Sequence, residues 1–133
     1  MRVVLDNNVI LSGLFREGSP RTLLESAAAG TFQAVTSPAL LAELEAVLRE
    51  DFEMPDGPRA EAMAFVLSFA EVVEDGGDVP VEVRDPGDAK VLSCAFQGRA
   101  EVIVTGDKDL LVLRGALGVR VLRVREFLDA MAP

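Results

Sequence analysis

Short apolar segments alternate with helix-forming segments along the whole sequence, and this alternation restricts the fold more than any other feature. Strands are predicted at residues 3–5, 32–36, 72–73, 102–104 and 119–124. Several of these runs are apolar throughout, which is typical of strands buried on both faces of a parallel sheet. We therefore expect a three-layer α/β fold with a central parallel sheet and helices on both sides. A chain of 133 residues without repeats or a linker is expected to form a single domain, residues 1–133.

Capping signals locate the predicted helices between these strands. Ser19-Pro20, Ser37-Pro38 and Asp85-Pro86 each place a capping residue before a first-turn proline. Helices are expected at residues 8–15, 20–29, 59–70, 85–97, 107–113 and 125–130, and residues 51–58 are expected to form a loop. A further helix after Ser37 carries an apolar stripe made of Leu40, Leu41, Leu44, Val47 and Leu48. This stripe and the 59–70 helix are candidate interface surfaces, with core packing as the alternative.

The residue types that are missing exclude several kinds of active site. Without histidine the chain has no Ser-His-Asp triad, no Cys-His pair and no imidazole metal ligand. A single cysteine, Cys94, excludes an intrachain disulfide and a cysteine zinc site, and its apolar surroundings predict burial. The reactive side chains that remain are chiefly the 22 aspartates and glutamates. Carboxylates favour hard divalent metal ions.

The formal net charge of −9 argues at first against nucleic acid, because phosphate-binding surfaces are usually basic. Net charge is not local charge, however, so this objection stays open. The N-terminal segment reaches Asp6 too early to form the apolar core of a signal peptide, and no apolar run approaches the roughly 20 residues of a membrane span. A cytoplasmic protein without a membrane segment is expected.

Acidic residues follow two of the predicted strands directly. Asp6 follows residues 3–5, and Asp107 and Asp109 come shortly after residues 102–104. Ligands of an open parallel sheet bind beyond the carboxyl ends of its strands, which is where these carboxylates are expected. The alternative is that Asp6 and Asp107 only cap the helices that follow.

Two further acids lie on predicted helices. Asp88 shares the i, i+3, i+4 pattern of its helix with Val91 and Leu92, so it is expected to point inward, although an acid in a first turn also suits the helix dipole. Glu43 and Glu45 border opposite sides of the apolar stripe after Ser37, and spacing alone does not choose between them.

Four motifs together resemble the PIN domain family. They are D-N-N-V at residues 6–9, the glutamate of S-P-A-L-L-A-E-L at 37–44, D-P-G-D-A-K-V-L at 85–92 and V-T-G-D-K-D-L-L at 104–111. Their order and spacing are similar to the subgroup described as toxins of toxin–antitoxin systems, the VapC-like ribonucleases. The resemblance extends to E-F-L at residues 126–128. It implies a PIN fold with an acidic cleft.

The resemblance also implies roles for individual residues. The family's catalytic, metal-binding acids are matched by Asp6, Glu43, Asp88 and Asp107, and a frequent fifth metal ligand is matched by Asp109. Polar residues that orient the acids or the water are matched by Asn8, Ser12 and Thr105, while Asp85 is either a helix cap or a supporting partner of Asp88. Asn7 stands where a threonine is common.

These residues predict an endoribonuclease that hydrolyses single-stranded RNA with one or two Mg²⁺ or Mn²⁺ ions, which would relieve the repulsion among the acids. Candidate phosphate contacts are Arg16, Arg21, Lys90 and Lys108, with surface salt bridges as the alternative. The resemblance further implies an antitoxin partner and a homodimer.

Three other functions stay open at this point. They are a housekeeping PIN nuclease of RNA processing, a catalytically inactive PIN-fold binding module, and a phosphoryl-accepting α/β domain. The last is disfavoured because Asp6 is followed by Asn7-Asn8-Val9, which lacks the second aspartate that such sites use.

Overall fold

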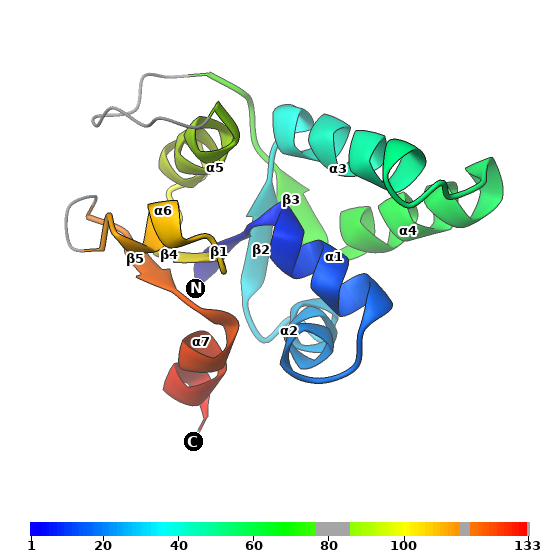
Figure 1. The fold of residues 1–133 in the computed structure, drawn as a ribbon. Helices are drawn as coiled ribbons and strands as arrows, with labels where there is room; N and C mark the ends of the chain where they lie inside the picture. The colour runs from blue at the N-terminus through cyan, green and yellow to red at the C-terminus, as the bar shows by residue number, and fades with distance from the viewer. Residues whose placement is uncertain (77–85, 115–117, 133) are drawn as a thin grey trace.

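A computed structural model describes residues 1–76, 86–114 and 118–132, and these form a five-stranded parallel sheet covered by helices. The strand order is β3-β2-β1-β4-β5. The strands are β1 (Arg2–Leu5), β2 (Gln33–Thr36), β3 (Ala70–Val72), β4 (Val102–Val104) and β5 (Arg120–Leu122). All pairings are parallel, as Figure 1 shows. The expected three-layer α/β/α architecture is confirmed.

Successive side chains of β1 point to opposite faces of the sheet and enter two different cores. Val3 and Leu5 of β1 pack into a core with α1 (Asn7–Phe15), α2 (Ser19–Ala28), α4 (Asp56–Phe69) and α7 (Val124–Met131). Val4 faces the opposite way, into a core with α5 (Pro86–Gln97) and α6 (Lys108–Leu111). α3 (Pro38–Glu50) contributes Leu40 to the second core and Leu44 to the first. Burial on both faces explains why the strand sequences are apolar throughout.

The order in which strands are added to the sheet reverses between β1 and β4. From β1 the chain builds outward to β2 and β3, and it later returns to add β4 and β5 on the other side. Leu5 is in register with Val104, so both strands end at the same level. The helix that follows β1 and the one that follows β4 lie on opposite faces of the sheet. Such a switch point opens a crevice at the carboxyl edge.

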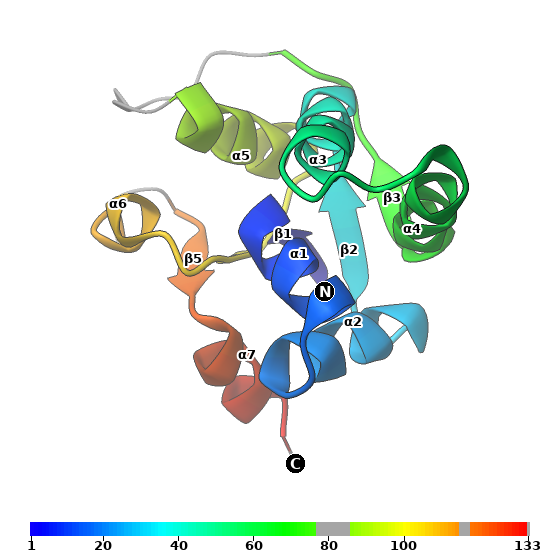
Figure 2. The ribbon, with the colours of Figure 1, turned by 45° about the vertical axis from the view of Figure 1, so that its right-hand side comes forward.

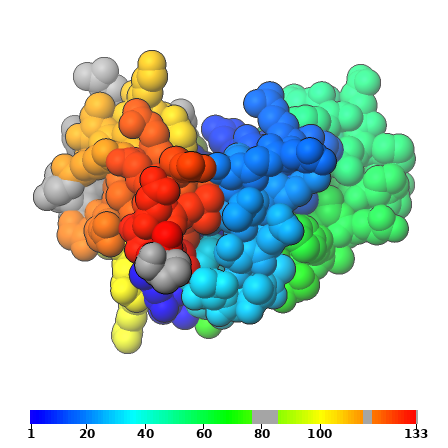
Figure 3. All heavy atoms as spheres, turned by 90° about the horizontal axis from the view of Figure 1, so that it is seen from below, coloured from blue at the N-terminus to red at the C-terminus, as the bar shows by residue number. Residues whose placement is uncertain are grey.

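Packing between distant segments completes the lower part of the molecule. Figure 2 shows α1 running from the end of β1 toward α2, and Figure 3 shows α7 lying against α2. Phe127 of α7 meets Phe32 edge-on, with ring centroids 5.1 Å apart. The contact fixes the C-terminal helix to the segment that leads into β2.

Several predicted boundaries need correction. α4 begins at Asp56 rather than at residue 59, because Pro58 falls in the first turn, where its missing N–H has no intrahelical partner to lose. β3 comprises Ala70–Val72 rather than residues 72–73, since the chain leaves α4 in extended conformation at Ala70. β5 and α6 are shorter than residues 119–124 and 107–113.

The apolar stripe of α3 belongs to the core rather than to an interface. Leu40, Leu44 and Leu48 are all at most 1% exposed. Cys94 is buried as well, and burial raises the pKa of its thiol to about 12. No helix within the described residues is long and apolar enough to cross a membrane.

Candidate functional site

An acidic pocket of about 260 Å³ opens at the carboxyl edge of the sheet. Its lining consists of Asp6, Asn8, Glu43, Gly87, Asp88 and Asp107. These residues come from the ends of β1 and β4 and from the helices α1, α3 and α5. The pocket therefore lies at the switch point, where the fold leaves space between neighbouring strands. Four of the six lining residues carry carboxylates, so the pocket would attract positive ions.

Thr105 links the two strand-end aspartates. Its side chain is fully buried, and its Oγ1 donates to Asp6 Oδ2 at 2.7 Å. The same Oγ1 accepts from the Asp107 backbone N at 3.0 Å. The Asp6 backbone N in turn donates to the Val104 carbonyl at 3.0 Å, which continues the β1–β4 pairing up to the pocket. One hydroxyl thus fixes the orientation of Asp6 and the path of the chain at Asp107.

The surroundings of Asp6 disfavour the charged form of its carboxyl group. It is 8% exposed, and burial is the main cause that raises the pKa of its carboxyl group. The negative charges of Asp107 and Glu43 raise that pKa further, while the Thr105 hydroxyl and the Asn8 backbone amide act in the opposite direction. A positive ion in the pocket would stabilise the charged carboxylate and so oppose this shift.

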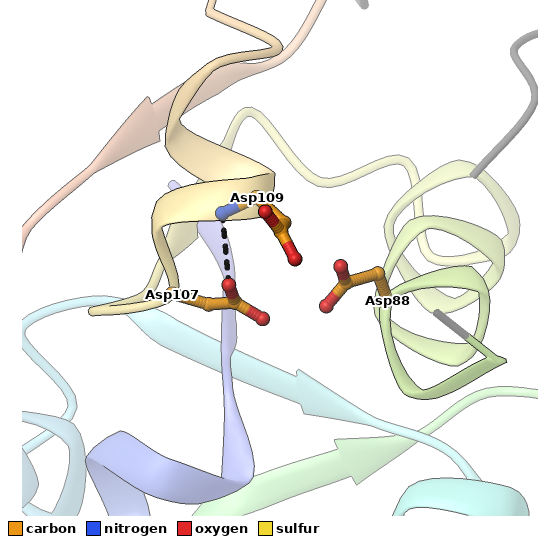
Figure 4. A group of neighbouring side chains, drawn as sticks. All are labelled: Asp88, Asp107 and Asp109. Carbon is orange, nitrogen blue, oxygen red and sulfur yellow. Dashed lines mark hydrogen bonds between the residues drawn. The ribbon is translucent and has the colours of Figure 1, made fainter. Parts of the chain in front are cut away.

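Three carboxylates converge beside Asp6. Asp88, Asp107 and Asp109 offer oxygen atoms that lie within 4.8 Å of one another, and Figure 4 shows all three pointing into the same space. Asp88 comes from the first turn of α5 and is buried, as its place on the apolar stripe predicted. Asp107 also caps α6 by accepting from the Asp109 backbone N at 2.9 Å. The capping role and the pocket role are therefore not alternatives for Asp107.

This donor set fits a hard divalent ion. Mg²⁺ holds oxygen ligands at about 2.0–2.1 Å, so ligands on opposite sides of one ion are about 4.2 Å apart. The separations of up to 4.8 Å need only a small closure. Asp109 is exposed and free of core packing, so its side chain can supply that movement.

Glu43 borders the pocket through different partners. Lys90 Nζ lies 3.1 Å from Glu43 Oε2. The amide Nδ2 of Asn7 donates to Glu43 Oε1 at 3.4 Å and to the Leu40 carbonyl at 2.8 Å. Glu45, by contrast, pairs with Arg49 and with Arg59 away from the pocket. The structure thus resolves the choice between the two glutamates of α3.

Other predicted residues lie outside the pocket lining. Ser12 is on α1, two turns beyond Asp6. Arg16 follows the end of that helix, about 14 Å from its start at 1.5 Å per residue, and Arg21 pairs with Glu17 at 3.9 Å. Lys108 lines a separate hollow of about 310 Å³ together with Leu111, Val112, Arg114 and Arg123. Asp85 lies outside the described residues.

The sequence did not reveal the contacts that Asn7 makes beside the pocket. It is 4% exposed and connects the start of α1 to α3 and to Glu43. The available signal was its polar side chain directly after Asp6, in a motif where the resembling family often has threonine. An asparagine supplies two N–H donors, which lets one side chain hold a carbonyl and a carboxylate together.

Comparisons with known proteins find a matching family, a similar sequence and a similar solved structure. The family described as PIN domain matches residues 2–109. An uncharacterized protein from Methanocaldococcus jannaschii is 29% identical over 119 residues, which cover 86% of this chain and 76% of that protein. Among solved structures, a chain in the crystal structure of VapBC2 from Rickettsia felis bound to a DNA fragment from their promoter is similar with a TM-score of 0.66 and 16% identity. That match covers 92% of this chain and 98% of the other, and it shows a shared fold.

Proposed function

The chain belongs to the PIN domain family, and from this premise we propose that it is a metal-dependent endoribonuclease acting on single-stranded RNA. Members of the family are generally nucleases. The observation that carries the proposal is the convergence of Asp88, Asp107 and Asp109 beside the buried Asp6. Carboxylates gathered at the end of a parallel sheet suit a phosphodiester substrate only when a cation joins them.

The residues of the pocket divide the work of hydrolysis. Asp88, Asp107 and Asp109 would hold the ion, which when bound supplies positive charge to the scissile phosphate and makes water more acidic. Asp6, bonded by Thr105, adds a carboxylate on the buried side of the pocket and would accept a proton from the attacking water. The exposed Asn8 lines the mouth, where its amide can orient a phosphate oxygen or water.

Binding of the strand falls to cations around the pocket. Lys90 lies at its edge, and its side chain is 41% exposed. Arg16 and Arg21 are a helix length away, so they would contact an extended strand several nucleotides from the cleaved bond. Because the chain contains neither tyrosine nor tryptophan, base stacking is limited, and weak sequence preference is the expected behaviour of the protein by itself.

We propose further that the protein is the toxin of a toxin–antitoxin pair. The shared fold with a chain in the VapBC2 structure supports an antitoxin partner, which we propose covers the pocket. An acidic pocket suits a basic side chain of such a partner, which would compete with the metal ion. A small protein encoded beside this one should suppress cleavage when it is added in equal amount. Unchanged cleavage in its presence would favour a housekeeping nuclease.

The decisive experiment is cleavage of single-stranded RNA with Mn²⁺, with Mg²⁺ or with EDTA. Asp6→Asn and Asp107→Asn should each lower the rate on the order of 10²-fold or more, since each loses a charge beside the ion. Asp51→Asn is the matched control, because Asp51 is an exposed acid at the end of α3. Cleavage that persists in EDTA, or Asp6→Asn acting at the wild-type rate, would overturn the mechanism.

A further inference from the structure

We infer that the pocket takes one divalent ion, and that the Lys90 ammonium group fills the place beside Glu43 that a second ion would otherwise take. The inference rests on the proposed function, because it refines how that function uses metal. It follows from two separate arrangements around the pocket. One gathers three aspartates, and the other engages both oxygens of Glu43 with nitrogen donors.

The first arrangement leaves Glu43 outside. Asp88, Asp107 and Asp109 form a group of three acidic side chains whose oxygens lie close enough to share an ion, and among the described residues no other group of three or more does so. Glu43 lines the same pocket but is not a member of this group. An ion centred on the three aspartates therefore does not draw on Glu43 as a ligand.

The second arrangement is built into the fold. Asn7 is buried and anchored by its 2.8 Å bond to the Leu40 carbonyl, so its amide reaches Glu43 from a fixed position. Lys90 lies on α5 two residues after Asp88, and its Nζ reaches Glu43 Oε2 from the opposite helix. The pair joins α3 to α5 across the pocket. Helices α1 and α5 thus each supply a nitrogen donor to Glu43, and the donor from α5 is positively charged.

An ammonium group and a divalent ion exclude each other at this carboxylate. Mg²⁺ would need to approach Glu43 Oε2 to about 2.0–2.1 Å, while Lys90 Nζ already lies 3.1 Å from the same atom. Two cations at such a distance repel each other, so the resident one must leave before the other binds. Lys90 is tethered to α5, which gives it a high effective concentration at Glu43.

The test is the number of Mn²⁺ ions bound, measured by isothermal titration calorimetry without RNA. The wild-type protein should bind one ion per chain, and Lys90→Gln should bind two, because Glu43 then becomes available as a ligand. Lys90→Arg keeps a positive charge and should still bind one. Lys108→Gln removes the same charge from an exposed position in a different hollow and should also bind one. Electron paramagnetic resonance should show coupling between neighbouring Mn²⁺ ions only in Lys90→Gln.

Any other number of bound ions overturns the inference. Two ions in the wild-type protein, or any number except two in Lys90→Gln, contradicts it, and so does a second ion in Lys108→Gln. Lys90 is half-exposed, so its variants should fold, and circular dichroism checks this. Metal binding without RNA cleavage would refute the proposed function and leave the ion count standing. Absence of Mn²⁺ binding to the wild-type protein would refute both.

Discussion

Replacing Thr105 with valine tests whether one buried hydroxyl holds the candidate site together. Valine preserves the shape of the side chain but removes the donor to Asp6 and the acceptor for the Asp107 backbone N. The bond to the charged carboxylate is worth about 1.5–3 kcal/mol and the neutral one about 0.5–1.5 kcal/mol. We therefore expect the free energy of unfolding to fall by about 2–4.5 kcal/mol.

This loss converts into a measurable change in melting temperature. At about 2.1 cal/mol/K per residue, a chain of 133 residues unfolds with an entropy of about 0.28 kcal/mol/K, so Thr105→Val should lower Tm by roughly 7–16 °C. Thermal unfolding followed by circular dichroism in EDTA measures it without any contribution from metal. Thr105→Ser keeps the hydroxyl and should cost only about 0.5–1.5 kcal/mol for the lost methyl group.

A double-mutant cycle with Asp6→Asn separates the hydrogen bond from general packing. In the Asp6→Asn background the Thr105 hydroxyl bonds a neutral group, so Thr105→Val should cost less there by about 1 kcal/mol or more. Equal costs in both backgrounds would refute the reasoning, as would a Thr105→Val protein no less stable than Thr105→Ser.

Three further predictions concern the stability of the protein. Burial raises the pKa of Asp6 above its usual value near 3.8. Without metal, the wild-type protein should therefore lose stability relative to Asp6→Asn as the pH rises from about 3.8 through the raised pKa. Tm values of both proteins across pH check this, and a Tm difference that stays constant would contradict it. Gly13→Ala should destabilise by about 1–3 kcal/mol, because its Cβ would lie 2.5 Å from Leu24 Cδ1, whereas Gly57→Ala meets no atom within 4 Å and should be neutral or slightly stabilising in urea titrations. Leu44→Ala removes a fully buried side chain and should lower the free energy of unfolding by about 2–5 kcal/mol, and a loss under 1 kcal/mol would show that the α3 contact is looser than described.

The layers of the fold could be predicted from sequence, but the order of the strands could not. Continuous apolar runs such as Val102–Val104 require cover on both faces, and this local property is enough to predict a parallel sheet. The contact between β1 and β4 joins residues about a hundred positions apart, and no local pattern records it. That contact is what brings Asp6 and Asp107 to one pocket. The sequence placed each acid at a strand end and left their proximity open.

Periodicity predicted the direction of a site residue only where the helix had one clear apolar face. Asp88 lies within the stripe of α5, and the structure buries it. Helix ends were less predictable. A proline such as Pro58 is compatible both with a loop and with a first turn, and packing of the residues that follow decides between them.

Glu43 and Glu45 show why the placement of negative charge matters more than its amount. The two residues are two positions apart on α3, and both are about one-third exposed. Glu45 meets Arg49 and Arg59, so its charge is matched by cations of the same face. Glu43 pairs with Lys90 at the edge of a pocket that holds several more carboxylates. Its negative charge contributes to the raised pKa of Asp6. Neighbouring carboxylates in one pocket favour a positive charge among them, so the net charge of −9 does not argue against a phosphate substrate. What decides the question is the cation that completes this one pocket.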